Sequence, residues 1–439
     1  MERLLLEQLI EWKQKPRRKP LIIHGARQVG KTWLMKEFGK ICFQQTAYIS
    51  FDNNEPAKSI FELDFDVSRV ISALKIASGV DIQPENTLIV FDEIQEAPKA
   101  ITALKYFCEN APEYYVIAAG SLLGMALHQG TSFPVGKVEF LHLFPLTFRE
   151  FLTAAGEKGL ASILYSDDYE MINVFSGKYA DLLRKYYYIG GMPEAVQCWL
   201  DTDNMQEVRS VQKQLLLYYE NDFSKHAPAE KIPRIQMVWN SIPAQLAKEN
   251  KKFIYGVIRE GARAKDFEIA IQWLSDYGLI YKSYCVSKPG MPLAAYKNLS
   301  IFKIYLLDVG LLSAMGNIPA QTLIQGNRIF EEFKGALTEQ YAAQELAAHG
   351  FDLFYYSSDN SAEVDFLVQK EALCIPVEVK AEENLRAQSL RAYCRKYDHS
   401  AAIRTSMANY REESWMSNVP LYWIGEYLTR LSPEAKQDT

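Results

Sequence analysis

The first third of the chain alternates short, wholly apolar runs with longer amphipathic stretches. Apolar runs lie at residues 21–23, 88–91 and 116–119. Such runs are typical of strands that are buried on both faces of a parallel sheet. Residues 2–13 instead repeat apolar side chains at helical spacing. The alternation predicts an α/β fold with a doubly wound parallel sheet.

The middle of the chain is mostly helical in pattern. Beyond the helical region at residues 156–217, three shorter helices precede two strands, predicted at 237–246, 254–259, 264–274, 279–286 and near 303–307. This order resembles a winged helix-turn-helix, which can bind DNA. Contact with another protein is the alternative role for such a module.

The last third returns to strands. A helix at residues 330–348 is followed by strands predicted at 352–356, 362–368 and 375–380. Residues two apart in a strand share a face, so Glu378 and Lys380 are expected to project together.

Two further carboxylates extend this pair into a candidate site. Asp365 ends a matching carboxylate array on the neighbouring predicted strand, and Glu339 can join it from the helix. The alternative is an ordinary pair of alternating strands with charged surface side chains.

A phosphate-binding loop is predicted directly after the first apolar run. Glycines at 25 and 30 let the backbone approach an anion closely, and the amide groups at the start of the next helix favour negative charge. Lys31 is expected to reach the β- and γ-phosphates of ATP, and Thr32 to ligate Mg²⁺. The alternative is a glycine turn that contains Lys-Thr by chance. The predicted nucleotide contacts are Gly25, Ala26, Arg27, Gln28, Val29, Gly30, Lys31, Thr32 and Trp33.

Two carboxylates end the second apolar run, at the edge of a parallel sheet where ligands bind. Asp92 is predicted to hold Mg²⁺, directly or through water, and Glu93 to polarise the attacking water. Ser121 follows the third run and is a candidate sensor of the γ-phosphate. Its alternative role is to cap the next helix.

The composition is typical of an ordinary globular protein with several domains. The 439 residues suggest two to four domains, with a net charge of −6 and 48% hydrophobic residues. No apolar run approaches the roughly 20 residues of a membrane helix. The N-terminus lacks signal-peptide character, and the six scattered cysteines form no CxxC pair. A cytoplasmic protein without a membrane partner is therefore expected.

Several motifs together resemble a widespread prokaryotic family of AAA-type ATPases that carry a C-terminal nuclease-like domain of uncharacterised function. The resemblance covers essentially the whole chain. It is carried by GARQVGKT at 25–32, VFDEIQ at 90–95, AGS at 119–121, FPLTFREF at 144–151 and YYIGGMPEAV at 187–196.

The resemblance implies a domain plan and a second metal site. The four domains would be a P-loop ATPase core, a helical lid, a winged helix-turn-helix and a PD-(D/E)XK nuclease-like α/β domain, at residues 1–155, 156–230, 231–315 and 320–439. In the last of these, the resemblance implies Asp365 and Glu378 as Mg²⁺ ligands, Lys380 as the residue that orients or activates water, and Glu339 as an additional member. Val364 stands where the PD motif has proline.

The family pattern also bears on the arginine finger and on assembly. Lys137 occupies a position where many members carry arginine, and lysine lacks the planar fork of a guanidinium group. Arg149 and Arg184 are weak stand-ins. AAA-type ATPases often form rings, so a homo-oligomer is a candidate assembly.

Basic residues in the predicted winged helix favour DNA as a candidate partner. They are Lys248, Lys251, Lys252, Arg259, Arg263 and Lys265.

The sequence supports two hypotheses about the function of the whole chain. In the first, a Mg²⁺-dependent ATPase acts on DNA through the winged helix and the nuclease-like domain. In the second, a nucleotide-gated switch binds a partner or nucleic acid without cleaving it.

Overall fold

The computed structural model describes residues 1–120, 133–166, 168–248, 251–325, 331–358, 363–381, 387–397 and 401–431. Internal contacts divide the chain into a smaller unit, Glu2–Phe144, and a larger unit, Pro145–Thr439. Among the described residues, no helix combines the length and the apolar character that a membrane span requires.

The smaller unit is built on five parallel strands in the order β2-β3-β4-β1-β5. The strands are β1 Leu21–His24, β2 Gln45–Ser50, β3 Thr87–Asp92, β4 Tyr115–Gly120 and β5 Glu139–His142. The helices are α1 Leu5–Gln14, α2 Lys31–Cys42, α3 Glu55–Ser59, α4 Val67–Ser78, the 3₁₀ turn η1 Ile94–Glu96 and α5 Pro98–Asn110. The predicted α/β fold with a parallel sheet is confirmed.

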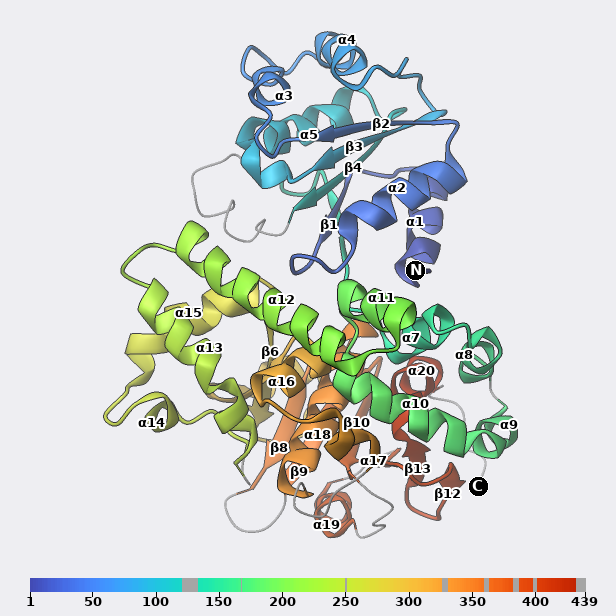
Figure 1. Ribbon diagram of the computed structural model, residues 1–439, viewed down its shortest axis with the longest axis vertical. Helices are drawn as coiled ribbons and strands as arrows, with labels where there is room; N and C mark the ends of the chain where they lie inside the picture. Colours follow the sequence, from blue (N-terminus) through green and yellow to red (C-terminus); the bar gives the residue numbers. More distant parts are fainter. Residues whose placement is uncertain are drawn as a thin grey trace. The chain divides into compact units, whose positions relative to one another are not determined.

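Helices cover both faces of this sheet (Figure 1). On one face, Trp12 of α1 packs against Phe38 of α2 and Tyr115 of β4. On the other face, α3, α4 and α5 enclose a second apolar cluster, in which the rings of Phe61 and Phe91 lie 5.7 Å apart. Burial on both faces explains why the strands are apolar throughout rather than alternating.

The larger unit contains one mixed sheet of eight strands, in the order β12-β13-β11-β10-β9-β8-β6-β7. These are β6 Ile280–Val286, β7 Lys297–Leu306, β8 Phe354–Ser357, β9 Glu363–Lys370, β10 Leu373–Val379, β11 Ile403–Ser406, β12 Arg411–Glu412 and β13 Ser417–Pro420. The hairpin β6–β7 is antiparallel, and β6 pairs in parallel with β8.

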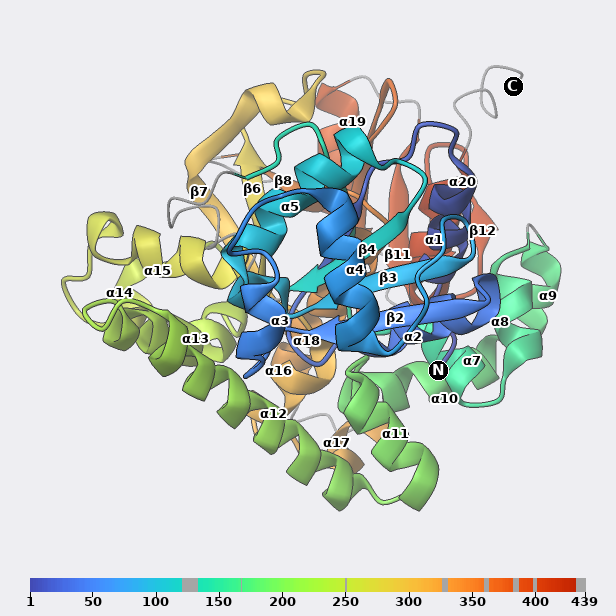
Figure 2. The same ribbon diagram turned by 90° about the horizontal axis from the view of Figure 1, so that it is seen from above.

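Helices surround this sheet. They are α7 Phe148–Ala154, α8 Lys158–Leu164, α9 Tyr169–Val174, α10 Ser176–Ile189, α11 Pro193–Thr202, α12 Met205–His226, α13 Ile232–Leu246, α14 Tyr255–Ile258, α15 Ala264–Asp276, α16 Val309–Met315, α17 Ala320–Gln325, α18 Glu331–Ala348, α19 Gln388–Lys396 and α20 Ile424–Arg430, with 3₁₀ turns η2 Leu293–Tyr296 and η4 Leu421–Trp423. Helix α18 packs against β6, β7 and β10, and α19 packs against β9 and β10. Figure 2 shows the long α12 running beside α13.

This sheet groups segments that the sequence predicted as separate domains. The predicted helical lid, winged helix-turn-helix and nuclease-like domain all lie in the larger unit, and the predicted first boundary at residue 155 lies inside it. The helices α13, α14 and α15 do precede a hairpin, as a winged helix requires. However, the hydrogen bonds between β6 and β8 continue that hairpin into the predicted nuclease-like strands.

Close backbone contact fixes the crossing of α10 and α16. A Cβ atom at Gly310 of α16 would lie 2.5 Å from the backbone nitrogen of Gly190 and 2.5 Å from the carbonyl oxygen of Ile189. Nearby, the buried carboxylate of Asp308 accepts hydrogen bonds from the N–H groups of Leu311 (2.9 Å) and Gly191 (2.6 Å). The glycines therefore allow an approach that any side chain would obstruct.

We expect Gly310→Ala to lower the free energy of unfolding by about 1–3 kcal/mol. The new methyl group would overlap the backbone of Ile189 and Gly190, which cannot move away as a flexible side chain can. Gly335→Ala is the matched control: it also lies in a helix, and a Cβ there meets nothing within 4 Å. The control should keep its stability or gain up to about 1 kcal/mol from helix propensity. Chemical denaturation of both variants checks the difference, and equal stabilities would contradict the tight crossing.

Candidate functional site

The loop between β1 and α2 adopts the curled backbone that an anion-binding loop needs. Gly25 has a φ of 150°, and a Cβ there would lie 2.2 Å from the carbonyl oxygen of Leu143. Gln28 and Gly30 also lie at positive φ, at 63° and 97°. Gly30 caps α2, which begins at Lys31. The amides at the start of α2 are thereby free of helical partners and are available to an anion.

The Lys31 ammonium group lies inside this loop. It donates hydrogen bonds to the carbonyl oxygens of Gly25 (2.9 Å) and Ala26 (2.7 Å), and its side chain is 7% exposed. Burial lowers the pKa of Lys31 to about 8, although the negative charges of Glu93 and Asp92 oppose this shift. A phosphate group near Lys31 would favour its charged form, so binding of an anion and protonation of Lys31 support each other.

The structure brings Thr32 and Asp92 together from α2 and the end of β3. The Thr32 hydroxyl donates a 2.6 Å hydrogen bond to Oδ2 of Asp92. Asp92 is buried, and its Oδ1 accepts the N–H of Glu93 at 3.1 Å. A hydroxyl and a carboxylate side by side are hard oxygen donors of the kind that Mg²⁺ takes next to phosphate oxygens and water. The donor set therefore fits the predicted magnesium ion of an ATP site.

Glu93 lies directly beyond β3 in a left-handed conformation, with φ 51° and ψ 46°. A glutamate in this region of the backbone map is strained, and strain of this kind clusters at functional sites. The side-chain amide of Gln95 donates a hydrogen bond to Oε2 of Glu93. Gln95 thus restrains the carboxylate that the sequence predicts to polarise water.

Sequence reasoning missed Tyr48, whose hydroxyl donates a 2.7 Å hydrogen bond to the same Oδ2 of Asp92. Burial and this hydrogen bond raise the pKa of Tyr48. The available signal was the predicted strand itself: Tyr48 lies two residues before Ser50, which pairs with Asp92 in the register of β2 and β3. Its side chain can therefore reach the end of the neighbouring strand.

A pair of histidines next to the loop was also missed. The rings of His24 and His142 lie 4.4 Å apart at the ends of β1 and β5. Burial, together with the neighbouring His24 and Lys31, lowers the pKa of His142 to about 3. Burial and then Lys31 likewise lower the pKa of His24. Both rings are therefore neutral at pH 7 and add no positive charge to the loop.

The predicted sensor Ser121 lies outside the described residues. Its strand, β4, does lie between β1 and β3 and ends at Gly120. The side chains at the three candidate arginine-finger positions, Lys137, Arg149 and Arg184, each form an ion pair. Lys137 pairs with Glu109 at 2.8 Å.

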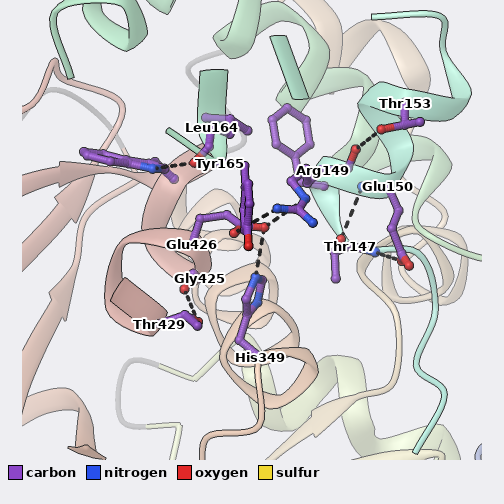
Figure 3. A network of polar contacts seen from close by, with 12 residues as sticks. Thr147, Arg149, Glu150, Thr153, Leu164, Tyr165, His349, Gly425, Glu426 and Thr429 are labelled. Atoms are coloured by element: carbon purple, nitrogen blue, oxygen red, sulfur yellow. Dashed lines mark hydrogen bonds and ion pairs between the residues drawn. The ribbon is translucent and has the colours of Figure 1, made fainter. Parts of the chain in front are cut away.

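The two stand-ins, Arg149 and Arg184, pair with carboxylates as well. Arg184 pairs with Asp181 on the surface of α10 at 2.8 Å. Arg149 lies in a buried network, and its Nε is 3.2 Å from Oε1 of Glu426 (Figure 3). The arginine side chain is only 11% exposed. Arg149 of α7 thus forms its ion pair with a residue of α20, Glu426.

The same network contains His349 and Glu345 of α18. Nε2 of His349 lies 3.4 Å from Oε1 of Glu426 (Figure 3). Oε1 of Glu345 accepts the N–H of Phe148 at 2.9 Å. Burial raises the pKa of Glu345 to about 7, although the positive charge of His349 and the Phe148 hydrogen bond oppose the shift. Burial disfavours the charged form of His349, but hydrogen bonding to Glu426 and the nearby carboxylates outweigh it and raise the pKa of His349.

In the C-terminal strands, the predicted residues Asp365 and Glu378 lie on the neighbouring antiparallel strands β9 and β10. Nζ of Lys380 is 2.7 Å from Oε1 of Glu378, as the shared strand face predicts. Oε2 of Glu378 accepts the N–H of Leu390 at 3.3 Å. Asp365 instead accepts the N–H of Val379 at 2.8 Å. Burial and the negative charge of Glu339 raise the pKa of Asp365 to about 7.

Two lysines that the sequence did not assign to this array pair with its carboxylates. Lys303 of β7 contacts Glu339 at 3.1 Å and Glu363 at 2.6 Å, and Lys251 contacts Glu339 as well. Among the described residues, no group of three or more His, Cys, Asp or Glu side chains is arranged to hold a metal ion. The Mg²⁺ ligation implied for Asp365 and Glu378 stays a prediction, and the ion pairs of Glu339 and Glu363 with Lys303 beside it argue against a bound cation.

Comparison with known protein families agrees with the geometry of the smaller unit. Residues 17–152 match the AAA domain family. Residues 180–322 and 334–424 match two domains of unknown function, DUF8612 and DUF4143. No curated protein matches the sequence.

Two solved structures resemble the chain in outline. A Walker-type ATPase of Pyrococcus abyssi is 13% identical and has a TM-score of 0.43, with 72% of this chain and 95% of that chain covered. The Orc1 protein of Aeropyrum pernix in complex with DNA is 13% identical and has a TM-score of 0.26, with 72% and 91% covered. These TM-scores are too low for either likeness to support an inference about this chain.

The network around Glu345 predicts a pH dependence of stability. Because its pKa is raised from 4.5 to about 7, the folded chain binds more protons than the unfolded chain between these values, and the stability that this proton supplies is lost as the pH rises through 7. We expect Glu345→Gln, which keeps the shape but carries no charge, to gain stability over the wild type between pH 5 and pH 8, by on the order of 1–3 kcal/mol.

Unfolding followed at several pH values checks this expectation. Glu170→Gln is the control, because Glu170 is exposed on α9. The control should follow the wild-type pH profile. A constant difference between Glu345→Gln and the wild type at all pH values would contradict the role of the Glu345 proton.

Proposed function

We propose that the chain is a Mg²⁺-dependent P-loop ATPase whose nucleotide state controls a DNA-binding larger unit. The match of residues 17–152 to the AAA domain family supports the ATPase. The main support for the Mg²⁺-dependent ATPase is the 2.6 Å hydrogen bond between Thr32 and Asp92. Contact between these two predicted metal ligands, beside a loop that contains the buried Lys31, supports the proposal.

The roles of the residues follow from their positions. Lys31 binds the phosphates within the loop, and Thr32 and Asp92 hold Mg²⁺, which supplies charge neutralisation for phosphoryl transfer when it is bound. Tyr48 orients the Asp92 carboxylate. Glu93, restrained by Gln95, accepts the proton of the attacking water or orients that water.

DNA binding is proposed for the region of α14 and α15. Arg259, Arg263 and Lys265 are exposed there, around the start of α15, and Ile269 is exposed on the same helix. Exposed basic side chains near a helix N-terminus can neutralise phosphates even on an acidic protein. Lys251 contributes less than its sequence position suggests, because its ammonium group faces Glu339.

A specific observation favours the non-cleaving hypothesis for the larger unit. The carboxylates Glu339 and Glu363 both pair with the buried Lys303, a lysine outside the implied motif. A cleaving site would present carboxylate oxygens to a divalent ion instead. We therefore propose a nucleotide-gated protein that binds nucleic acid without cutting it. A homo-oligomer and a cytoplasmic location belong to the same proposal, the latter supported by six free cysteines.

Purified protein should hydrolyse ATP when Mg²⁺ is present, and Lys31→Ala should lower the turnover at least about 100-fold, because it removes the buried charge that faces the phosphates. Lys40→Ala is the matched control, since Lys40 is exposed on the same helix, and it should keep the wild-type rate. Release of inorganic phosphate with and without DNA measures both variants. Equal turnover of wild type and Lys31→Ala would exclude hydrolysis at this site.

Plasmid DNA incubated with the protein, ATP and either Mg²⁺ or Mn²⁺ should remain intact, because the carboxylates of the larger unit are paired with lysines. Asp365→Ala and Lys380→Ala serve as controls for contaminating nucleases, and they should be indistinguishable from the wild type on an agarose gel. Nicking by the wild type that disappears in both variants would select the cleaving hypothesis.

A further inference from the structure

A fully buried lysine lies among the carboxylates of the larger unit. Lys303 is 0% exposed on β7, and its Nζ lies 3.1 Å from Oε1 of Glu339 and 2.6 Å from Oε1 of Glu363. Burial disfavours the ammonium ion, but the negative charges of Glu339, Glu363 and Asp365 outweigh this effect and raise the pKa of Lys303. The side chain is therefore a permanent internal cation at neutral pH.

Glu339 is enclosed by donors on both of its oxygens. Oε1 accepts hydrogen bonds from Lys303 and from the hydroxyl of Tyr305, and Oε2 accepts one from Lys251. Burial alone would raise the pKa of Glu339, but Lys251 and Lys303 outweigh it and lower the pKa to about 2. The Glu339 carboxylate thus stays ionised, and its polar groups are satisfied by the protein.

The charges of this ion-pair cluster nearly balance without any metal. The cluster consists of Glu339, Glu363, Asp365, Lys251 and Lys303. Two ammonium groups face the carboxylates of Glu339 and Glu363, while burial and Glu339 raise the pKa of the third carboxyl group, Asp365, to about 7. A divalent cation in the same volume would lie against two positive charges and would need several carboxylate or water oxygens as ligands.

The two sides of the cluster come from segments that the sequence predicted as different domains. Lys251 follows α13, and Lys303 lies on β7, both in the predicted winged helix. Glu339 lies on α18, whereas Glu363 and Asp365 lie on β9, in the predicted nuclease-like domain. The ion pairs therefore join the hairpin and helices on one side to the sheet strands on the other.

We infer that this ion-pair cluster is a metal-independent lock, in which Lys303 and Lys251 take the place of a divalent cation and fasten the predicted winged helix to the predicted nuclease-like strands. The inference deepens the non-cleaving function proposed above and rests on it, but it does not depend on ATP hydrolysis. Breaking one partner of a buried ion pair leaves a buried, unpaired charge, which is strongly destabilising.

The first test measures Mn²⁺ binding to the full chain without nucleotide, by isothermal titration calorimetry, for wild type and Asp365→Asn. The lock predicts either no binding or binding that is unchanged in Asp365→Asn, because any such ions lie elsewhere. Binding by the wild type that is lost in Asp365→Asn would overturn the inference. Phosphate release from ATP, measured on the same preparations, reports separately on the proposed ATPase.

The second test compares the melting temperatures of Lys303→Met and Lys297→Met. Lys297 is exposed on the same strand and is the matched control. We expect Lys303→Met to melt roughly 5–10 °C below the control, or to remain unfolded where the control folds, because Glu339 and Glu363 lose their buried counter-ion. Equal melting temperatures for the two variants would overturn the lock.

Discussion

The need to compensate buried charge shapes both units of this protein. A charged side chain that is removed from water must be paired, hydrogen-bonded or neutralised. In the smaller unit, the buried Lys31 is held by loop carbonyl groups, and Asp92 accepts two hydroxyl hydrogen bonds. In the larger unit, Lys303 is held by two glutamates. The hydrogen-bond partners of the Lys31 ammonium group are neutral carbonyl groups, whereas those of Lys303 are carboxylates that compensate its charge.

This difference separates the two motifs that the sequence predicts as ligand sites. The phosphate loop depends on backbone shape, and the positive φ values of Gly25 and Gly30 supply that shape locally. Whether the array of Asp365, Glu378 and Lys380 can bind a metal depends instead on the side chains that other segments bring next to it. Residue types and spacing are compatible with a metal site, but they do not reveal that Lys251 and Lys303 pair with the nearby Glu339.

Much of the fold could be predicted because its signals are local. Buried parallel strands are apolar throughout, and β1, β3 and β4 were found within a residue or two of their observed bounds. The ion pair between Lys380 and Glu378 followed from strand alternation. The bond between Lys303 and Glu339 spans 36 residues, and the pairing of β6 with β8 spans more than 60, so no local pattern encodes them. Tyr48 was missed for the same reason, since its partner lies on another strand.

The eight-stranded sheet has a consequence for how this protein can have diversified. Because β6 shares backbone hydrogen bonds with β8, and β7 forms the edge of the same sheet, the stretch from α13 to β7 is not a detachable module. If a different sequence replaced this stretch through gene recombination, the edge of β8 would be exposed. Glu339 and Glu363 would also lose the buried counter-ion that Lys303 provides. The two matched regions of unknown function, at 180–322 and 334–424, are therefore expected to be inherited together.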